Sequence, residues 1–432
     1  MSNFLRPLII TLWLGVFWVG SVLGAQNSST VAIVGAHLVR LDGSGVLRDS
    51  VVLIENERIS AIGTASDVVI PAGARKIQLD DAWLAPGLMN MHVHWGLILP
   101  GREAARLADE TNAALALRMA KNARDSLLSG TTTVRMPGDR RHADLALLRA
   151  IERGDAVGPR LISAGQMVPI THGHGAKGRA GYDGPYELMK GVRKEIHAGA
   201  TWIKIAISGG IATDGGGIAE ALMTPEEIHA VIDAAHRFGA KVTAHSGSPS
   251  ATSIAVKAGI NSIEHGYHLT REVLREMKNA GTWYVPTIVV SQPATLPFFV
   301  KIGSPEWYLK RRDSTGKNHW KALEMAIEEG VDIALGTDQL PHEPNDGTVA
   351  TVREAEYYVS AGMSSLQALR SATIEPAKML GLDSDIGSLE VGKFADIIAV
   401  SGNPLEDIKS LRTIFFVMKG GAIVRNDLVD PL

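Results

Sequence analysis

The stretch Pro86-Gly87-Leu88-Met89-Asn90-Met91-His92-Val93-His94 decides the fold expected for this chain. In it, an apolar run leads from a Pro-Gly turn to two histidines separated by one valine. Residues two apart in a β-strand point to the same side, so His92 and His94 should project together while Met91 and Val93 face the other way. Two imidazoles on one face can chelate a metal ion; the alternative is a pair of hydrogen-bonded core histidines.

From Leu88 to Gly336, apolar β-like runs alternate with helix-compatible stretches, a pattern typical of parallel strands joined by crossover helices. The candidate strands are Leu88 to His94, Thr131 to Met136, Arg160 to Ala164, Trp202 to Ser208, Lys241 to His245, Ser262 to His265, Trp283 to Val289 and Asp332 to Gly336. Eight strands are the number that closes a (β/α)8 barrel. We therefore predict an α/β fold with a TIM barrel over residues 87–389.

Short β-branched runs separated by turn residues lie near both ends of the chain. They are Val31 to Val34, Val51 to Glu55 and Arg58 to Ile62 at one end, and Ile397 to Val400, Thr413 to Lys419 and Ala422 to Arg425 at the other. Because both ends of the chain have this pattern of short strands and turns, we predict that they fold together into one unit. We expect a small β-sandwich domain built from residues 26–86 and 390–432.

The first residues have the pattern of a targeting segment. Arg6 supplies a positive charge, Leu8 to Leu23 are almost entirely apolar, and the small residues Gly24 and Ala25 precede polar ones. We predict a signal peptide over residues 1–25 and export to the periplasm or the medium. An uncleaved anchor is the alternative, although the apolar run is shorter than the ~20 residues of a spanning helix.

Composition narrows the class of protein. A chain of 432 residues with 45% hydrophobic residues can bury a sizeable core. The net charge of -3, with both signs scattered, provides no basic stripe for nucleic acid. The absence of cysteine means that any metal must be held by nitrogen and oxygen, and it excludes a cysteine-linked lipid, so no stable membrane association is expected after signal cleavage.

Lys204 lies in Trp202-Ile203-Lys204-Ile205-Ala206, where the flanking isoleucines suggest that both faces of the strand are covered. A buried ammonium is costly unless it is paired or chemically changed. The side chain could instead reach outward to water. Carbamylation by carbon dioxide would turn it into a carboxylate able to bridge two cations.

Three further candidates end predicted strands, where barrel enzymes carry their chemistry. His245 closes its strand, His265 closes the next, and Asp338 follows Ile333 to Thr337. Asp338 could cap a helix, or it could bind metal and accept a proton from bound water. Four imidazoles, one carboxylate and a possible carbamate favour zinc or a similar divalent ion over calcium or magnesium. The candidate ligands are His92, His94, Lys204, His245, His265 and Asp338.

These motifs resemble those of the amidohydrolase superfamily, in the branch with imidazolonepropionase-like proteins, prolidase-like dipeptidases and ochratoxin-degrading amidases. The likeness covers nearly all of the chain after the signal segment, and Gly387 to Asp396 resembles the return from barrel to β-sandwich. It implies two divalent ions, preferably Zn2+, that share a hydroxide. In the implied arrangement the first ion is bound by His92, His94 and Asp338, the second by His245 and His265, and both are bridged by Lys204 as N6-carboxylysine.

The resemblance also points to substrate-binding residues. Thr171-His172-Gly173-His174-Gly175 resembles a family segment after the third strand, so His174 would hold the substrate carbonyl or oxyanion, whereas His172 departs from the family pattern. A histidine in such a glycine-rich loop could instead bond only backbone. Tyr267, two residues after His265, could hold a substrate carboxylate or be an ordinary packing tyrosine.

The implied reaction is hydrolysis of an exocyclic amide that releases a C-terminal amino acid from a dipeptide or N-acyl amino acid, with ochratoxin-type amides included. Asp338 would act as proton shuttle. Opening of a cyclic amide, as in imidazolonepropionases and hydantoinases, is the enzymatic alternative, and a catalytically inactive exported binding protein is the alternative from another class. We expect a small-molecule substrate, no nucleic acid and a homo-oligomer.

Overall fold

The computed structural model describes residues 30–176, 180–213, 216–338 and 348–429. The predicted signal peptide, residues 1–25, lies outside this described part. Within it, no helix combines the length and the apolar character that crossing a bilayer would require.

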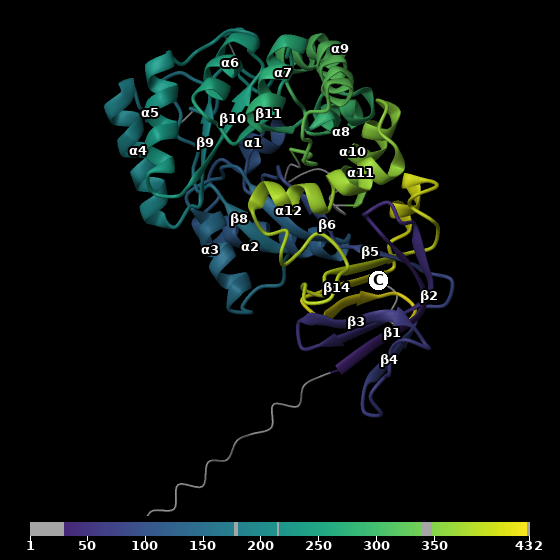
Figure 1. Cartoon of the computed structure of the whole chain (residues 1–432). Coiled ribbons are helices and arrows are strands. Elements are labelled where there is room, and N and C mark those ends of the chain that lie inside the picture. Colours follow the sequence, from purple (N-terminus) through teal and green to yellow (C-terminus); the bar gives the residue numbers. More distant parts are fainter. Residues whose placement is uncertain (1–29, 177–179, 214–215, 339–347, 430–432) are drawn as a thin grey trace, which may run out of the picture.

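Strands and helices alternate through the middle of the chain (Figure 1). The strands are Thr30–Val39 (β1), Val46–Glu55 (β2), Arg58–Thr64 (β3), Arg75–Gln78 (β4), Trp83–Pro86 (β5), Leu88–Asn90 (β6), Thr131–Met136 (β7), Arg160–Ser163 (β8), Trp202–Ala206 (β9), Lys241–Ser246 (β10), Ser262–His265 (β11), Trp283–Val285 (β12), Ile397–Val400 (β13), Phe416–Lys419 (β14) and Ala422–Asn426 (β15). The α-helices are Arg102–Arg106 (α1), Asn112–Leu128 (α2), Ala143–Glu152 (α3), Gly184–Ala198 (α4), Pro225–His236 (α5), Pro249–Lys257 (α6), Arg271–Ala280 (α7), Leu296–Lys301 (α8), Glu306–Glu329 (α9), Thr348–Ser360 (α10), Ser365–Ser371 (α11) and Ile374–Leu380 (α12). Short 3-10 helices cover Ile288–Val290 (η1), Pro293–Thr295 (η2) and Ile408–Thr413 (η3).

Both ends of the chain contribute to one mixed sheet, in the order β15-β14-β13-β5-β1-β2-β3, with β4 pairing with β1. Antiparallel pairing of β5 with β13 places Leu84 opposite Ala399 and so joins the two ends. Figure 1 shows the purple N-terminal and yellow C-terminal strands side by side. The predicted composite unit is therefore present. Its described strands form one hydrogen-bonded sheet, and no second facing sheet of a sandwich is found among them. The domain limits stay predictions.

Two parallel sheets, β6-β7-β8 and β9-β10-β11-β12, form the middle of the chain. The predicted strands Thr131 to Met136 and Ser262 to His265 have the bounds that the structure gives them. Helices follow most of these strands, as crossover connections require. The α/β class is confirmed.

The first predicted strand was too long, because β6 ends at Asn90 and both histidines lie beyond it. A side chain interrupts the ladder there. The Nε of Arg135, on β7, donates to the Met91 carbonyl at 2.8 Å, an acceptor that a backbone amide would otherwise use. The sequence of the first strand alone cannot predict where it ends when the donor comes from a side chain on another strand.

The seventh predicted strand was also too long, since β12 ends at Val285 and η1 begins at Ile288. Pro286 has no N–H for a ladder, and Thr287 adopts a φ of 56°, in the left-handed region. These two residues stop the strand.

The eighth predicted strand, Asp332 to Gly336, is reduced to an isolated parallel bridge between Tyr284 and Ile333. Individual hydrogen bonds still join this segment to both neighbours. Tyr284 N donates to Asp332 O at 2.9 Å on one side, and Met91 N donates to Leu335 O at 2.8 Å on the other. The segment thus lies between β12 and the residues after β6, but no continuous strand ladder closes a barrel in the described part of the chain.

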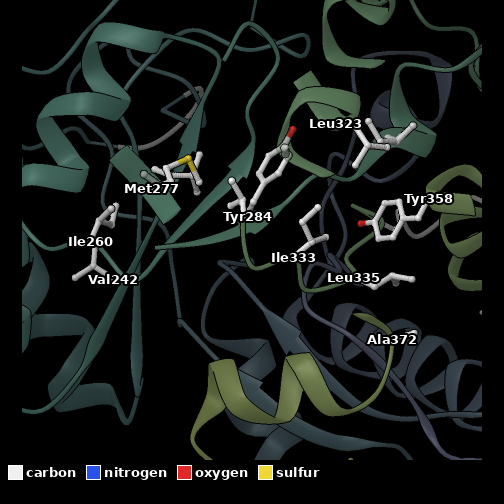
Figure 2. Packing of buried hydrophobic residues seen from close by; sticks show 14 of the residues in the cluster. Val242, Ile260, Met277, Tyr284, Leu323, Ile333, Leu335, Tyr358 and Ala372 are labelled. Carbon is white, nitrogen blue, oxygen red and sulfur yellow. The ribbon is translucent and has the colours of Figure 1, made fainter. Parts of the chain in front are cut away.

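A hydrophobic core lies between the parallel strands and the helices that pack around them. Tyr284 and Ile333 lie among Met277, Leu323 and Tyr358, all buried, in Figure 2. Complete burial of a large apolar side chain contributes about 1.5–3 kcal/mol, so this core is a main source of stability. This core fixes the positions of the strand ends, and the polar residues lie at those ends.

Candidate metal centre

Three ligand atoms from the ends of the predicted first and eighth strands converge. The Nε2 atoms of His92 and His94 are 3.0 Å apart, and each lies 3.4 Å from Oδ1 of Asp338. Tetrahedral zinc with ligand bonds of ~2.0–2.1 Å has ligand atoms roughly 3.3 Å apart, so this spacing fits one divalent ion. The prediction that the two histidines project together is confirmed.

The second ring nitrogen of each histidine is held by an acceptor. His92 Nδ1 donates to Glu264 Oε2 at 2.6 Å, and His94 Nδ1 donates to the Gly138 carbonyl at 2.6 Å. Each histidine is thereby left with an Nε2 lone pair on the side of Asp338, where an ion could be bound. Burial lowers the pKa of His94 to about 3 and that of His92 well below its usual value, so both rings are in the neutral form that binds metal.

His245 and His265 form the second part of the centre. Their ring centroids are 4.6 Å apart, and His265 lies 4.9 Å from His92. His245 Nε2 donates to Gly209 O at 3.0 Å, which leaves Nδ1 with a lone pair. His265 Nδ1 hydrogen bonds to the Thr287 hydroxyl at 2.7 Å, which leaves Nε2 available when the hydroxyl accepts.

Register explains why His265 needs an unusual backbone. In β11, Glu264 pairs with His245 of β10, so alternation assigns the inward-facing position to Glu264 and the outward one to His265. His265 adopts a φ of 66°, which ends the strand and accounts for its ring lying beside His245. The sequence interpretation expected a strand-ending histidine to face the site but did not foresee this turn; the structure brings the His265 ring beside His245.

Lys204 is 1% exposed, and its Nζ has no hydrogen-bond partner among the described residues. It lies on the strand that pairs with β10, opposite Thr243. Its Cγ is 3.6 Å from the position that a Cβ on Gly138 would take, and Gly138 is the residue that holds His94. Burial lowers the pKa of Lys204 to about 8. The buried, unsatisfied amine excludes the outward-reaching alternative.

Asp338 adopts a φ of 52°, and its amide donates to the His92 carbonyl at 2.8 Å. Burial raises the pKa of Asp338 to about 7, and the nearby Lys204 ammonium opposes this shift. A carboxyl group with a pKa near neutrality can both accept and release a proton.

A buried ion pair beneath the histidines was missed by the sequence interpretation. Arg135 Nη2 donates to Glu264 Oε1 at 2.7 Å, and both side chains are fully buried. Ser262 Oγ also donates to that carboxylate at 2.9 Å, so Glu264 connects Arg135 with His92. The available signal was one arginine within the predicted strand Thr131–Met136 and a glutamate directly before His265.

His174 stacks on His245 with ring centroids 3.9 Å apart, and its Nδ1 hydrogen bonds to the Thr213 hydroxyl. Gly210 permits this contact, because a Cβ there would lie 2.6 Å from the His174 ring and 2.7 Å from the His245 ring. Burial lowers the pKa of His174 to about 3. The structure thus places His174 beside the histidine cluster, whereas His172 is exposed.

Tyr267 stacks on His265, with centroids 5.1 Å apart and the rings 5° from parallel. It is 3% exposed and packs in a buried apolar cluster formed by residues of η1, α8, α9 and neighbouring loops. The other buried members of that cluster are Leu99, Ile211, Val289, Val290, Phe299, Ile302 and Tyr308. Tyr267 therefore lies between the histidines and an apolar wall.

A separate buried carboxylate, Asp144, provides a test of pH dependence. It is 0% exposed, it accepts a hydrogen bond from Ser163, and burial raises its pKa to about 7. Because unfolding returns this pKa to ~3.9, protonated Asp144 contributes stability below about pH 4 that is lost as pH rises through 7. When the pH is raised from 5 to 8, the unsubstituted protein should therefore lose about 2 kcal/mol of unfolding free energy through Asp144. The variant Asp144→Asn lacks this titration and should not show that loss.

The measurement is denaturant unfolding of the metal-free protein at both pH values. Asp155→Asn, at an aspartate whose side chain is 61% exposed, is the control and should show the same loss as the unsubstituted protein. Equal pH dependence of the two variants would contradict the assignment.

Comparison with known proteins places this geometry in a family. Residues 83–425 match the Amidohydrolase family. Ochratoxinase of Aspergillus niger is 28% identical over 451 residues, covering 95% of this chain and 90% of that protein, and its crystal structure superposes with a TM-score of 0.80. A Xaa-Pro dipeptidase crystal structure with bound methionine has a TM-score of 0.84 and 33% identity, covering 92% of this chain and 100% of that chain.

Imidazolonepropionase of Sphingopyxis alaskensis is 25% identical over 401 residues, covering 84% of this chain and 90% of that protein. The relatives therefore span the three groups named by the sequence resemblance. Together with the group formed by His92, His94 and Asp338, these matches show that the chain belongs to the amidohydrolase family and is a hydrolase that acts on amide bonds.

Proposed function

We propose that this protein is a binuclear metal-dependent amidohydrolase that cleaves an exocyclic amide and releases a C-terminal amino acid from a dipeptide or N-acyl amino acid. The observation that carries the proposal is the convergence of His92 Nε2, His94 Nε2 and Asp338 Oδ1 within 3.0–3.4 Å. The buried cluster of His245 and His265 beside it supplies ligands for a second ion.

His92, His94 and Asp338 would hold the first ion, and His245 and His265 the second. Lys204, as N6-carboxylysine, would bridge the two. This assignment gives the buried, unsatisfied Nζ of Lys204 a role, because the neutral amine that burial favours is the form that reacts with carbon dioxide. We also propose that the strands around this centre close as a (β/α)8 barrel, and that residues 1–25 direct export.

Two divalent cations, preferably zinc, would lower the pKa of water and polarise the amide carbonyl. Asp338 takes the proton of the attacking water at its carboxylate and delivers it to the leaving amine. His174, beside His245, is positioned to hold the substrate carbonyl oxygen. Tyr267 presents its ring between the metal centre and the apolar wall, where the released amino acid would sit.

The substrate class rests on two observations. Relatives named as a Xaa-Pro dipeptidase and an ochratoxinase align with most of this chain. The wall around Tyr267 is apolar and partly aromatic, with Phe299 and Tyr308 among its members. We therefore expect preference for amides of amino acids with apolar side chains over charged ones.

The test is a screen of dipeptides and N-acyl amino acids with metal-reconstituted enzyme, together with metal analysis and intact mass. Two ions per chain, a mass increase of one carbon dioxide that Lys204→Ala abolishes, and release of free amino acid are expected. Chelated enzyme is the control and should recover activity when zinc is restored.

Absence of bound metal in active protein would contradict the proposal. Turnover confined to cyclic amides would favour the imidazolonepropionase-like alternative. Bound ligand without any turnover would favour an inactive binding protein.

A further inference from the structure

The turn after β12 is held by a carboxylate from a distant helix. Glu354, on α10, is 0% exposed. Its Oε1 accepts the amide of Ile288 at 2.7 Å, and its Oε2 accepts the amide of Val289 at 2.9 Å. These are the first amides of η1, which have no partner inside their own helix. The carboxylate therefore fixes where η1 begins.

The residue just before η1 is strained. Thr287 has a φ of 56°, a region that β-branched residues rarely adopt. Such a conformation costs about 1–3 kcal/mol and persists only where surrounding contacts impose it. The Thr287 hydroxyl, set by this backbone, bonds His265 Nδ1 at 2.7 Å.

His319 restrains the two ends of the same turn. Its Nε2 donates to Pro286 O at 2.8 Å, and its Nδ1 accepts from Ser291 Oγ at 2.8 Å. Between those ends, the amides of Ile288 and Val289 are held by Glu354. Glu354 thus binds the two amides that directly follow Thr287. It lies 65 positions after Val289 in the chain.

We propose that Glu354 is a positioning residue for the metal ligand His265. By holding the start of η1, it imposes the left-handed conformation of Thr287, whose hydroxyl orients the His265 ring so that Nε2 faces the second ion. This inference rests on the proposed function, in which His265 is a ligand. It also links α10, the described helix that follows Asp338 in sequence, to the opposite half of the centre.

A carboxylate suits this task, because it offers two acceptor oxygens to two amides. Glutamine has nearly the same shape but turns one of those oxygens into an NH2 donor that faces a donor. Glu354→Gln should therefore release one of the two amides while leaving the volume of the core unchanged.

The experiment compares metal binding by the full-length protein, Glu354→Gln and Glu195→Gln. Glu195 is a matched control, since it is also buried and accepts a backbone amide, that of Gln166, at 2.9 Å, while its hydrogen-bonded side chain is His142 rather than a residue of the turn after β12. Zinc per chain is measured against a competing chelator, and the thermal midpoint is measured on the metal-free proteins.

Glu354→Gln is expected to weaken binding of one of the two ions by roughly 10–100-fold and to leave the other unchanged. Glu195→Gln should retain both ions even if its thermal midpoint falls equally. Wild-type affinity for both ions in Glu354→Gln would overturn the inference and leave Glu354 a purely structural role.

If Glu354→Gln fails to fold, Thr287→Ala tests the step on which the inference depends, because it removes the hydroxyl that orients His265 and leaves the Glu354 contacts in place. Selective loss of one ion supports the inference, and retention of both overturns it. A wild-type protein that binds only one ion would instead contradict the proposed function, so the two failures are distinguishable.

Discussion

Asp338→Asn is expected to lower turnover by roughly 10³-fold, because the amide cannot accept a proton from water or pass it to the leaving amine. Asp338 is placed for this role by its Oδ1, which lies 3.4 Å from both His92 Nε2 and His94 Nε2. The measurement is kcat on the best substrate of the screen, at matched metal content per chain. An asparagine oxygen can still coordinate, so metal loss and proton-transfer loss are separated by quantifying bound zinc.

The pH profile gives the same prediction a second readout. The acid limb of kcat/KM should reflect Asp338, whose pKa of about 7 in the metal-free site will fall when cations bind beside it. Asp338→Asn should remove that limb from its residual activity. Full turnover with an unchanged profile would rule out Asp338 as the proton shuttle.

Arg135→Met is expected to destabilise the protein by about 3–5 kcal/mol, because it leaves the Glu264 carboxylate buried without its cation. Both side chains are 0% exposed and bond at 2.7 Å, so the carboxylate loses its cation at a position shielded from bulk water. The measurement is the denaturant midpoint and slope of the metal-free protein, which removes any contribution from bound ions.

The double variant Arg135→Met with Glu264→Gln is the control for this prediction. It removes both charges and keeps an oxygen that can accept from His92 Nδ1, so it should recover a large part of the lost stability. If the unfolding free energy of Arg135→Met alone lies within about 0.5 kcal/mol of the wild-type value, the ion pair does not stabilise the core. A change that small is typical of substitutions at surface positions.

Local pattern was sufficient for several features of the fold. The strand Thr131–Met136 and the strand Ser262–His265 were predicted with their observed bounds, because each is a short run enclosed by turn-forming glycine or asparagine residues. The sequence also predicted that the two chain ends join, because both contain short β-branched runs separated by turn residues. Where strands stop was less predictable, since Arg135 interrupts β6 and Glu354 organises the turn after β12 from far along the chain.

The amino-acid sequence by itself determined the α/β class and placed five of the candidate ligands at or just after the ends of β-like segments, with Lys204 inside a strand, since alternation and chain order are local properties. Those five are His92, His94, His245, His265 and Asp338. Only the tertiary structure decided how these side chains are aimed. Arg135 and Glu264 lie 129 positions apart, and the ion pair that holds His92 exists only when β7 and β11, which belong to different sheets, are brought together by folding. The left-handed turn at Thr287 is likewise held by contacts from other elements, because a β-branched residue rarely adopts this conformation, whereas histidine and aspartate, as at His265 and Asp338, adopt it more readily.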